Sequence, residues 1–402
     1  MKAVKKQLGL VVISGALASG VHAENSVTLY GSVSTGLTYI SNQRTTALPN
    51  GNYVGHPNTI LYGSGPYYGD RWGFKGSEDL GGGTRAIFQL ENGFNVANGA
   101  LGQGGRLFGR QAWVGLADDR YGQLTMGRQY DPPVDMIGNI IYAYGGGTFT
   151  HPGDIDQIDA NVRFNNSVRY STPTIAGFKF SGMYALNGTP GSVMDGSAYS
   201  FGASYTRGPL SAAASFTTMR NGTSTLPTTW SATTDSIFTS SINEGLASSR
   251  NTQFAVLAAG YRFDKLNVGI SYSNSLYRPQ QISAFHNTAV FNDIGLNFGY
   301  VITPTVIVSG SYNFLRRNAM SGAGGNAGSA TYNQITAALD YLLSKRTILY
   351  AVIGYQHASG QAINSKGQVV DATASVGDLM NGGLSSATGN QVAPTIGIRH
   401  FF

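Results

Sequence analysis

The stretch Leu266-Asn-Val-Gly-Ile-Ser-Tyr-Ser273 alternates one apolar side chain with one small or polar side chain. The stretches 294–300 and 306–314 repeat this alternation. Because successive side chains of a strand point to opposite faces, each stretch predicts a β-strand with one apolar face. The runs are about 10 residues long, enough to cross a membrane at a tilt, whereas strands of soluble sheets average about 5–6.

The composition fits a chain whose surroundings are only partly water. Of the 402 residues, 55 are Gly, 23 are Tyr and 19 are Phe, and only 11% are charged. Disordered chains need more charge, coiled coils need more Ala, Glu, Lys and Leu, and collagen needs a Gly-X-Y repeat. The chain has no cysteine, which excludes disulfides, cysteine-bound zinc and a cysteine nucleophile.

The first residues predict a secretory signal. Three lysines precede an apolar run over residues 8–17, and Val21-His-Ala23 fits a small-x-small cleavage site. We therefore expect a signal peptide at residues 1–23 and a mature barrel at residues 24–402. Cleavage removes the three lysines and no acid, which halves the formal net charge of +6. The basic composition therefore gives little support to a nucleic-acid partner, and none is expected.

The connections between the alternating runs are in turn short and long. Seven tight turns and eight longer segments separate them, which predicts sixteen strands with both termini on the short-turn side. A sheet in lipid must pair all its backbone groups, so it must close, and sixteen strands leave a water-filled lumen. The predicted fold class is an all-β transmembrane protein: a closed antiparallel 16-stranded outer-membrane β-barrel. The long segments are expected near 41–69, 96–105, 131–162, 187–197, 220–250, 277–290, 318–330 and 358–390.

Several motifs spread over the whole mature chain carry a family resemblance. They are Ser26-Val-Thr-Leu-Tyr-Gly31, Arg71-Trp-Gly-Phe-Lys-Gly-Ser-Glu-Asp-Leu-Gly-Gly-Gly83, Gly109-Arg-Gln-Ala-Trp-Val-Gly115, Tyr121-Gly-Gln-Leu-Thr-Met-Gly-Arg128, Leu343-Ser-Lys-Arg-Thr347 and Gly397-Ile-Arg-His-Phe-Phe402. Together they resemble the general porins of β-proteobacteria, the group that includes neisserial, Bordetella and Burkholderia porins.

The resemblance implies a location and a set of partners. It implies a homotrimer in the Gram-negative outer membrane, surrounded by lipid bilayer and lipopolysaccharide, with the third external loop folded into each lumen. The C-terminal aromatic Phe402 resembles the signal that the bacterial barrel-insertion machinery reads. The implied function is general diffusion of ions and small hydrophilic solutes through a water-filled channel, with no enzymatic activity and no cofactor.

The third long segment, residues 131–162, is the candidate constriction loop. It contains five aspartates and no Lys or Arg; these are Asp131, Asp135, Asp154, Asp156 and Asp159. We expect them to face cations on the barrel wall. Rows of charge in a narrow wet passage set its ion preference. The effect of the loop aspartates therefore depends on which charged wall residues lie opposite them.

Strand parity selects the wall residues. Trp72 and Phe74 are expected to face outward, which turns Arg71 and Lys75 into the lumen. The same reasoning places Glu91, Arg163 and Arg169 inside, and a cation facing lipid would cost about 2–4 kcal/mol at the midplane. The family resemblance assigns an arginine cluster to Arg71, Arg110 and Arg163. Arg110 shares the parity of apolar neighbours, so only a bulge or the end of the strand could turn it inward.

From these charges the sequence predicts a weak anion preference. The alternative is a channel specific for one anion or sugar, to which Tyr142, Tyr144 and Phe149 could contribute. A barrel enzyme is not expected, because the histidines are scattered and no Gly-x-Ser-x-Gly motif is present. Neither Gly81-Gly-Gly83 nor Gly145-Gly-Gly147 continues to Gly-Lys-Ser/Thr, so neither predicts a nucleotide site, and no metal site is expected.

Overall fold

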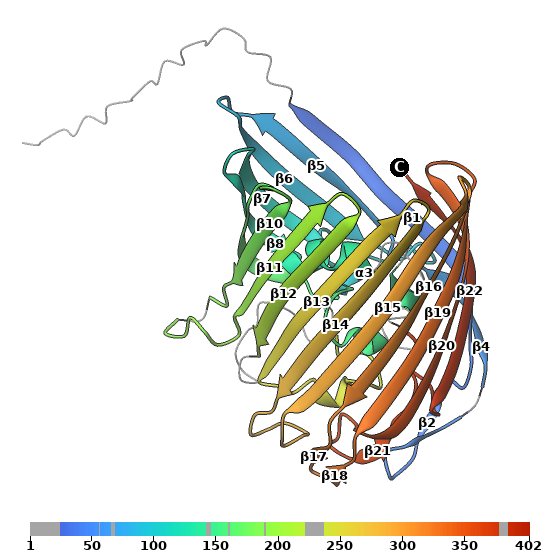
Figure 1. Cartoon of the computed structure of the whole chain (residues 1–402). Helices are drawn as coiled ribbons and strands as arrows, with labels where there is room; N and C mark the ends of the chain where they lie inside the picture. Colours follow the sequence, from blue (N-terminus) through green and yellow to red (C-terminus); the bar gives the residue numbers. More distant parts are fainter. Residues whose placement is uncertain are drawn as a thin grey trace, which may run out of the picture.

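Strand β1 (Ser26–Ile40) closes the sheet of this protein in a computed structural model (Figure 1). It pairs on one side with β22 (Asn390–Phe401), and on the other with β4 (Thr59–Ser64) and then β5 (Arg71–Asp79). Every pairing in the wall is antiparallel, and apart from the closing β1–β22 pair it joins wall strands that follow one another in the chain. Closure removes the free edges that a sheet cannot leave exposed in lipid.

The structure describes residues 25–55, 57–65, 69–141, 146–159, 161–188, 190–221, 237–377 and 385–402. The predicted signal peptide, together with Tyr142 and Tyr144, lies outside the described residues. Within the described ranges, no helix is long and apolar enough to cross a membrane.

The wall contains sixteen strands within the described part of the chain, which confirms the predicted number. β4 and β5 follow each other along β1 as one interrupted strand, and β21 (Val369–Asp371) pairs only with the end of β20. The segment 41–69 was expected to be all loop, but it contributes β4. The remaining wall strands are β6 (Thr84–Gly93), β7 (Gln111–Asp118), β8 (Gly122–Gln129), β9 (Phe164–Ser171), β10 (Phe178–Ala185), β11 (Ala198–Arg207), β12 (Leu210–Arg220), β13 (Asn251–Phe263), β14 (Leu266–Arg278), β15 (Ala289–Thr303), β16 (Val306–Arg317), β19 (Ala330–Leu342) and β20 (Thr347–Ile363).

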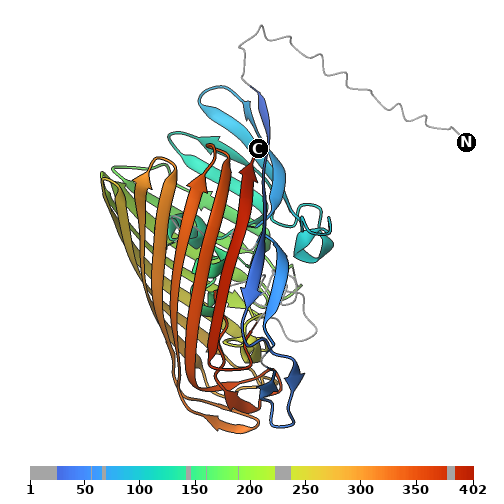
Figure 2. The ribbon, with the colours of Figure 1, turned by 90° about the vertical axis from the view of Figure 1, so that its right-hand side faces the viewer.

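The two ends of the barrel differ in the length of their connections. The seven turns lie at the end where β22 finishes, and the longer loops lie at the opposite end (Figures 1 and 2). The long loops carry two short hairpins and a helical turn. These are β2 (Thr46–Ala47) with β3 (Tyr53–Val54), β17 (Met320–Gly322) with β18 (Gly325–Ala327), and α1 (Gly102–Gly105). By the usual rule for such barrels, the short-turn end faces the periplasm.

The alternation in the sequence becomes the two faces of the wall. On β15 the outward side chains Ile294, Leu296 and Phe298 are nearly half exposed. On the adjacent β14 the inward hydroxyls Ser271 and Ser273 are buried inside the barrel. The apolar side chains therefore face the membrane, while small polar side chains leave space in the interior for the loop and for water.

Part of the interior is a dry core built by the long loops. Near the loop end, Phe254, Tyr277 and Phe291 of the strands pack with Phe238 and Leu246 of the 237–250 loop. The loops therefore fold inward over one part of the mouth and bury apolar surface of their own.

Candidate pore constriction

The described parts of the loop, residues 131–141, 146–159 and 161–162, lie inside the barrel along the inner faces of β11 to β20 (Figures 1 and 2). It forms α2 (Pro132–Met136), α3 (Gly138–Ile141) and the 3-10 turns η1 (Gly147–Phe149) and η2 (Pro152–Asp154). Two prolines open α2, where the missing N–H groups would have had no partner in the helix.

The helical half of the loop is held to the wall by apolar contact. Met136, Ile137 and Ile140 pack against Ala213 and Val256, with Ile141, Ile158 and Ala258 in the same cluster. Small wall residues let the helix approach closely. At Gly202, a Cβ atom would lie 2.6 Å from the Met136 sulfur and 3.2 Å from Pro132 Cβ, so a side chain there would push the Met136 side chain aside and crowd the start of α2.

The second half of the loop is held by hydrogen bonds and one aromatic ring. The Gln334 amide donates to the carbonyl of Thr150 at 2.9 Å, and the Thr336 hydroxyl donates to the carbonyl of Thr148 at 3.2 Å. Phe149 packs with Tyr350 and Val352. Phe149 therefore anchors the loop. Because its ring is buried, it is not accessible to a solute in the passage. We call β11–β14, β19 and β20 the loop-covered wall.

On the other side of the lumen, Arg71 and Arg110 share one carboxylate. Arg110 Nε lies 2.7 Å from Glu91 Oε1, and Arg71 Nε lies 3.9 Å from Glu91 Oε2. Arg110 directly precedes β7, so the outward parity of that strand does not apply to it. This is the strand-end position that the sequence allowed as one way to turn it inward. Glu91 itself is buried and also accepts a hydrogen bond from the Tyr30 hydroxyl at 2.9 Å.

Tyr130 connects Arg110 to two further arginines of the wall, Arg163 and Arg169. Its ring lies 5.9 Å from the Arg110 guanidinium and 5.3 Å from that of Arg163. Its backbone carbonyl accepts a hydrogen bond from Arg169 Nη1 at 3.1 Å. We call Arg71, Arg110, Arg163 and Arg169 the arginine wall. Each cation in it is positioned by an aromatic ring, a carbonyl or a carboxylate.

Two of the loop aspartates face this arginine wall. Asp135 Oδ2 lies 2.5 Å from Arg169 Nη2, which joins α2 to β9. Asp159 accepts a hydrogen bond from the Thr150 hydroxyl at 2.9 Å. Burial raises the pKa of Asp159, and the nearby Arg163 and Arg110 partly offset that rise.

The other three loop aspartates do not face the arginines as expected. Asp131 accepts a hydrogen bond from the Thr217 hydroxyl at 2.9 Å, so it is turned to the loop-covered wall. Burial raises the pKa of Asp131 to about 6. Asp154 accepts hydrogen bonds within the loop, and Asp156 lies 2.7 Å from His151 Nδ1. Local loop geometry uses these carboxylates, and composition could not indicate that.

Lys75 lies apart from the candidate constriction. It is exposed, and its ammonium lies 5.5 Å from the Tyr30 ring, towards the short-turn end of β5. Seven of the eight predicted site residues thus lie in the loop, on the arginine wall or between its arginines, and Lys75 does not.

Sequence reasoning missed Tyr130 and Arg128. On β8, Arg128 has the outward parity of Leu124 and Met126, but the pairing with β9 shifts register between Gly127 and Gln129. This bulge turns Arg128 inward, where its guanidinium donates to the carbonyls of Gly109 and Arg163. Bulges commonly re-aim side chains near functional sites. The glycine before the arginine was the signal available in the sequence.

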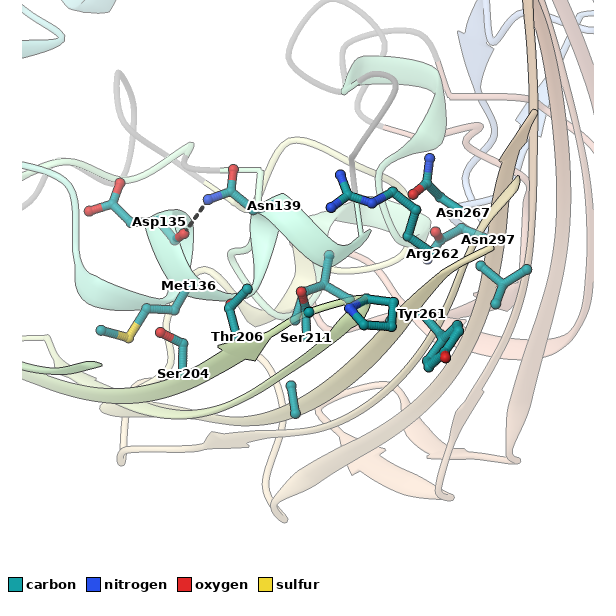
Figure 3. A pocket seen from close by; sticks show the side chains of 16 residues that line it. Asp135, Met136, Asn139, Ser204, Thr206, Ser211, Tyr261, Arg262, Asn267 and Asn297 are labelled. Atoms are coloured by element: carbon teal, nitrogen blue, oxygen red, sulfur yellow. Dashed lines mark hydrogen bonds between the residues drawn. The ribbon is translucent and has the colours of Figure 1, made fainter. Parts of the chain in front are cut away.

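A polar pocket of about 320 Å³ lies between α2, α3 and the ends of β11 to β15 (Figure 3). Asp135, Asn139, Arg262, Asn267 and Asn297 lie around it, with Ser204, Thr206 and Ser211 on the wall. It opens towards the short-turn end, because the β11–β12 turn at Gly208 contributes to its lining. Among the described residues, no group of three or more His, Asp or Glu is arranged to hold a metal ion.

This geometry defines a class of protein: a closed membrane barrel with a long loop folded inside it, opposite a cluster of wall arginines. Similarity to known proteins agrees with this class. Residues 9–361 match the Gram-negative porin family. The chain belongs to this family, and it is a protein of the Gram-negative outer membrane.

Individual relatives cover different shares of the chain. It is 37% identical over 187 residues to an outer membrane porin protein of Bordetella pertussis, and 34% over 190 residues to major outer membrane protein P.IB of Neisseria gonorrhoeae. Each match takes in 46% of this chain and 49% of the relative, so the chain spans about half the length of these relatives. Outer membrane porin protein 32 of Delftia acidovorans is 27% identical over 408 residues, which cover 98% of this chain and 99% of that protein.

Solved structures share the fold. The anion-selective porin from Comamonas acidovorans has a TM-score of 0.68 at 21% identity, covering 94% of this chain and 100% of that one. The trimer form of OmpT from Vibrio cholerae has a TM-score of 0.61 at 13% identity, covering 94% and 99%.

Proposed function

We propose that this chain is a general diffusion porin with a weak preference for anions. The observation that supports this most directly is the arrangement of charge across the lumen. Four guanidinium groups of the arginine wall face the carboxylates of Glu91, Asp135 and Asp159, while Asp131 binds the loop-covered wall and Asp154 and Asp156 are paired within the loop. A small excess of fixed positive charge raises the local concentration of anions.

The transverse arrangement also explains why small hydrophilic solutes would pass. Cations on one wall and carboxylates on the loop opposite create a field across the passage. Polar solutes can align in that field, whereas apolar solutes must displace ordered water. The proposed constriction consists of Arg71, Arg110, Arg163 and Arg169 with Glu91, Asp135 and Asp159, and Tyr130 positions the arginines.

Planar-bilayer recording in asymmetric KCl tests the channel and its selectivity together. The expected result is stepwise conductance with a reversal potential of the sign for a modest excess of chloride permeability. A reversal potential that favours potassium would contradict the anion preference, and absence of conductance from folded protein would contradict the porin function.

We also propose that the chain forms a homotrimer and that the barrel-insertion machinery recognises Phe402. The Phe402 backbone pairs with Gly31 through two hydrogen bonds of 3.0 and 3.1 Å, and its side chain stays 43% exposed. That exposure leaves the C-terminal ring accessible to the barrel-insertion machinery and to surrounding lipid or lipopolysaccharide. Conductance that rises in groups of three steps supports the trimer. Deletion of Phe402 should reduce the amount of assembled protein in the outer membrane.

A substrate-specific channel is the second candidate, and the polar pocket beside α2 favours it. Asp135, Asn139 and Arg262 could bind a solute that carries both charge and hydroxyl groups. Saturable block of single-channel current by one anion or sugar, weakened by Arg262→Ser, would favour this candidate over general diffusion. Current that stays linear with solute concentration would argue against it.

A further inference from the structure

His151 occupies a buried position between the constriction loop and the barrel wall. It lies between η1 and η2, and its side chain is 1% exposed. Imidazole Nδ1 lies 2.7 Å from Asp156 Oδ2 in the loop and 3.6 Å from Asp293 Oδ1 on β15. Imidazole Nε2 lies 3.4 Å from the Ser271 hydroxyl on β14.

A glycine of the wall leaves the space that this ring shares with the side chains of Ser271 and Asn313. Gly295 faces Ser271 across the β14–β15 pair, and a Cβ atom at position 295 would lie 3.2 Å from His151 Nε2. Asp293 is held in place by the Asn313 amide, which donates to its Oδ1 at 3.0 Å. The site is thus assembled from four elements: the loop, β14, β15 and β16.

The charges around the ring favour its protonated form. Both carboxylates have no exposed side-chain surface, and buried charges are costly unless an opposite charge is close. Burial opposes a charge on His151, but Asp156 and Asp293 outweigh this effect and raise its pKa to about 9; Asp159 acts in the same direction. The nearby Tyr277 hydroxyl on β14 donates to the Ile155 carbonyl at 2.8 Å.

We propose that His151 is a positioning residue, an imidazolium that fastens the second half of the constriction loop to β15 by bridging Asp156 and Asp293. Loss of its proton leaves two buried carboxylates facing each other without a cation. The part of the loop around His151 then detaches from β14–β15 and moves further into the passage, while Thr148 and Thr150 stay hydrogen-bonded to β19. This inference depends on one part of the proposed function, namely that the loop borders a conducting pore.

The direction of the pH dependence follows from the raised pKa. The folded protein holds the proton more tightly than an exposed histidine, whose pKa is 6.5. The imidazolium therefore contributes its full stabilisation below about pH 6.5 and loses it as the pH rises to about 9. The loop should be docked at neutral pH and released under alkaline conditions.

Single-channel recording of the full mature protein in phosphatidylcholine bilayers between pH 6 and pH 10 tests the proposal. We expect open-state lifetimes to shorten with a midpoint near pH 9. Asp293→Asn should lower that midpoint by about one pH unit, because one neighbouring carboxylate no longer stabilises the imidazolium. His151→Asn should abolish the transition. Identical pH profiles for wild type and His151→Asn would overturn the proposal, as would an unshifted midpoint in Asp293→Asn.

A matched control and a second measurement keep the test independent of folding and of conduction. Asp340→Asn removes another buried wall carboxylate, on β19, and should leave the midpoint unchanged. A shift in Asp340→Asn equal to that in Asp293→Asn would overturn the assignment. Hydrogen exchange of the part of the loop around His151 in wild-type protein, corrected for intrinsic rates, should lose protection over the same pH range while β14 and β15 keep theirs. Retained protection at pH 10 would refute the release even in a protein that conducts normally.

Discussion

The loop-covered wall and the arginine wall line the same barrel but interact with the constriction loop in different ways. The loop-covered wall offers apolar side chains, amides and hydroxyls, and it buries the loop against them. The arginine wall meets the loop mainly through charge, in the Arg169–Asp135 pair and beside Asp159. Packing therefore fixes the position of the loop, whereas charge is proposed to set the ion preference of the remaining passage.

The largest expected effect comes from breaking the packing on the loop-covered wall. Gly202→Val places a branched side chain where a Cβ atom alone would lie 2.6 Å from the Met136 sulfur. Overpacking of this kind costs about 1–3 kcal/mol, so we expect α2 to undock and single-channel noise to increase. Gly182→Val is the control, because a Cβ atom there meets only the Phe201 ring at 3.2 Å. Equal noise in both variants would mean that α2 does not depend on close contact at Gly202.

The next effect concerns the buried carboxylate of Asp131. Its pKa of about 6 lies above the usual 3.8, so the folded protein binds this proton more tightly than the unfolded chain does. Stability from this group is therefore greatest below about pH 4, falls as the pH rises to about 6, and stays low above it. Asp131→Asn should remove this dependence and stabilise the docked loop by up to about 3 kcal/mol at pH 7. Heat-resistance of the folded band on gels at pH 5 and pH 8 measures it. A change in heat-resistance between pH 5 and pH 8 that is larger in Asp131→Asn than in the wild type would contradict this explanation.

A smaller effect is expected from changing single charges on the arginine wall. Arg110→Ser and Arg163→Ser should each shift the chloride-to-potassium permeability ratio towards potassium by roughly twofold. A unit charge acting through water at about 8 Å contributes about 0.5 kcal/mol, which is the basis of that estimate. Asp135→Asn should shift the ratio in the opposite direction. Reversal potentials in a KCl gradient measure all three, and shifts of one sign throughout would rule out the transverse arrangement.

The smallest effect is expected at Lys75. It is a cation of the same barrel, but it lies over Tyr30 towards the short-turn end, away from the loop. Lys75→Ser should therefore leave the permeability ratio within error of wild type under the same conditions. A shift as large as that of Arg110→Ser would mean that the arginine wall extends further along β5 than its contacts indicate.

Much of the fold could be predicted because it depends on side-chain period. Alternation over β14 and β15 identified strands and their outward faces, and alternating connection lengths gave the number of strands. Parity assigned Arg71, Arg163 and Arg169 to the inner face, and all three lie on the arginine wall, although Arg163 directly precedes β9 and the adjacent Phe164 is buried. It could not decide Arg110, which precedes its strand, or Arg128, which a bulge turns inward. A change of one residue in register reverses the face of a side chain.

The sequence by itself determined a closed membrane barrel, its inner and outer faces and an acidic long loop, because these follow from patterns between neighbouring residues; only the family resemblance implied that this loop enters the barrel. Only the tertiary structure decided how the acids of that loop are divided: Asp135 and Asp159 towards the arginines, Asp131 to a wall hydroxyl and Asp156 to His151. Each of these partnerships joins residues whose contact depends on the path of the folded loop. A buried carboxylate acquires its role from whichever donor or cation that path brings within reach.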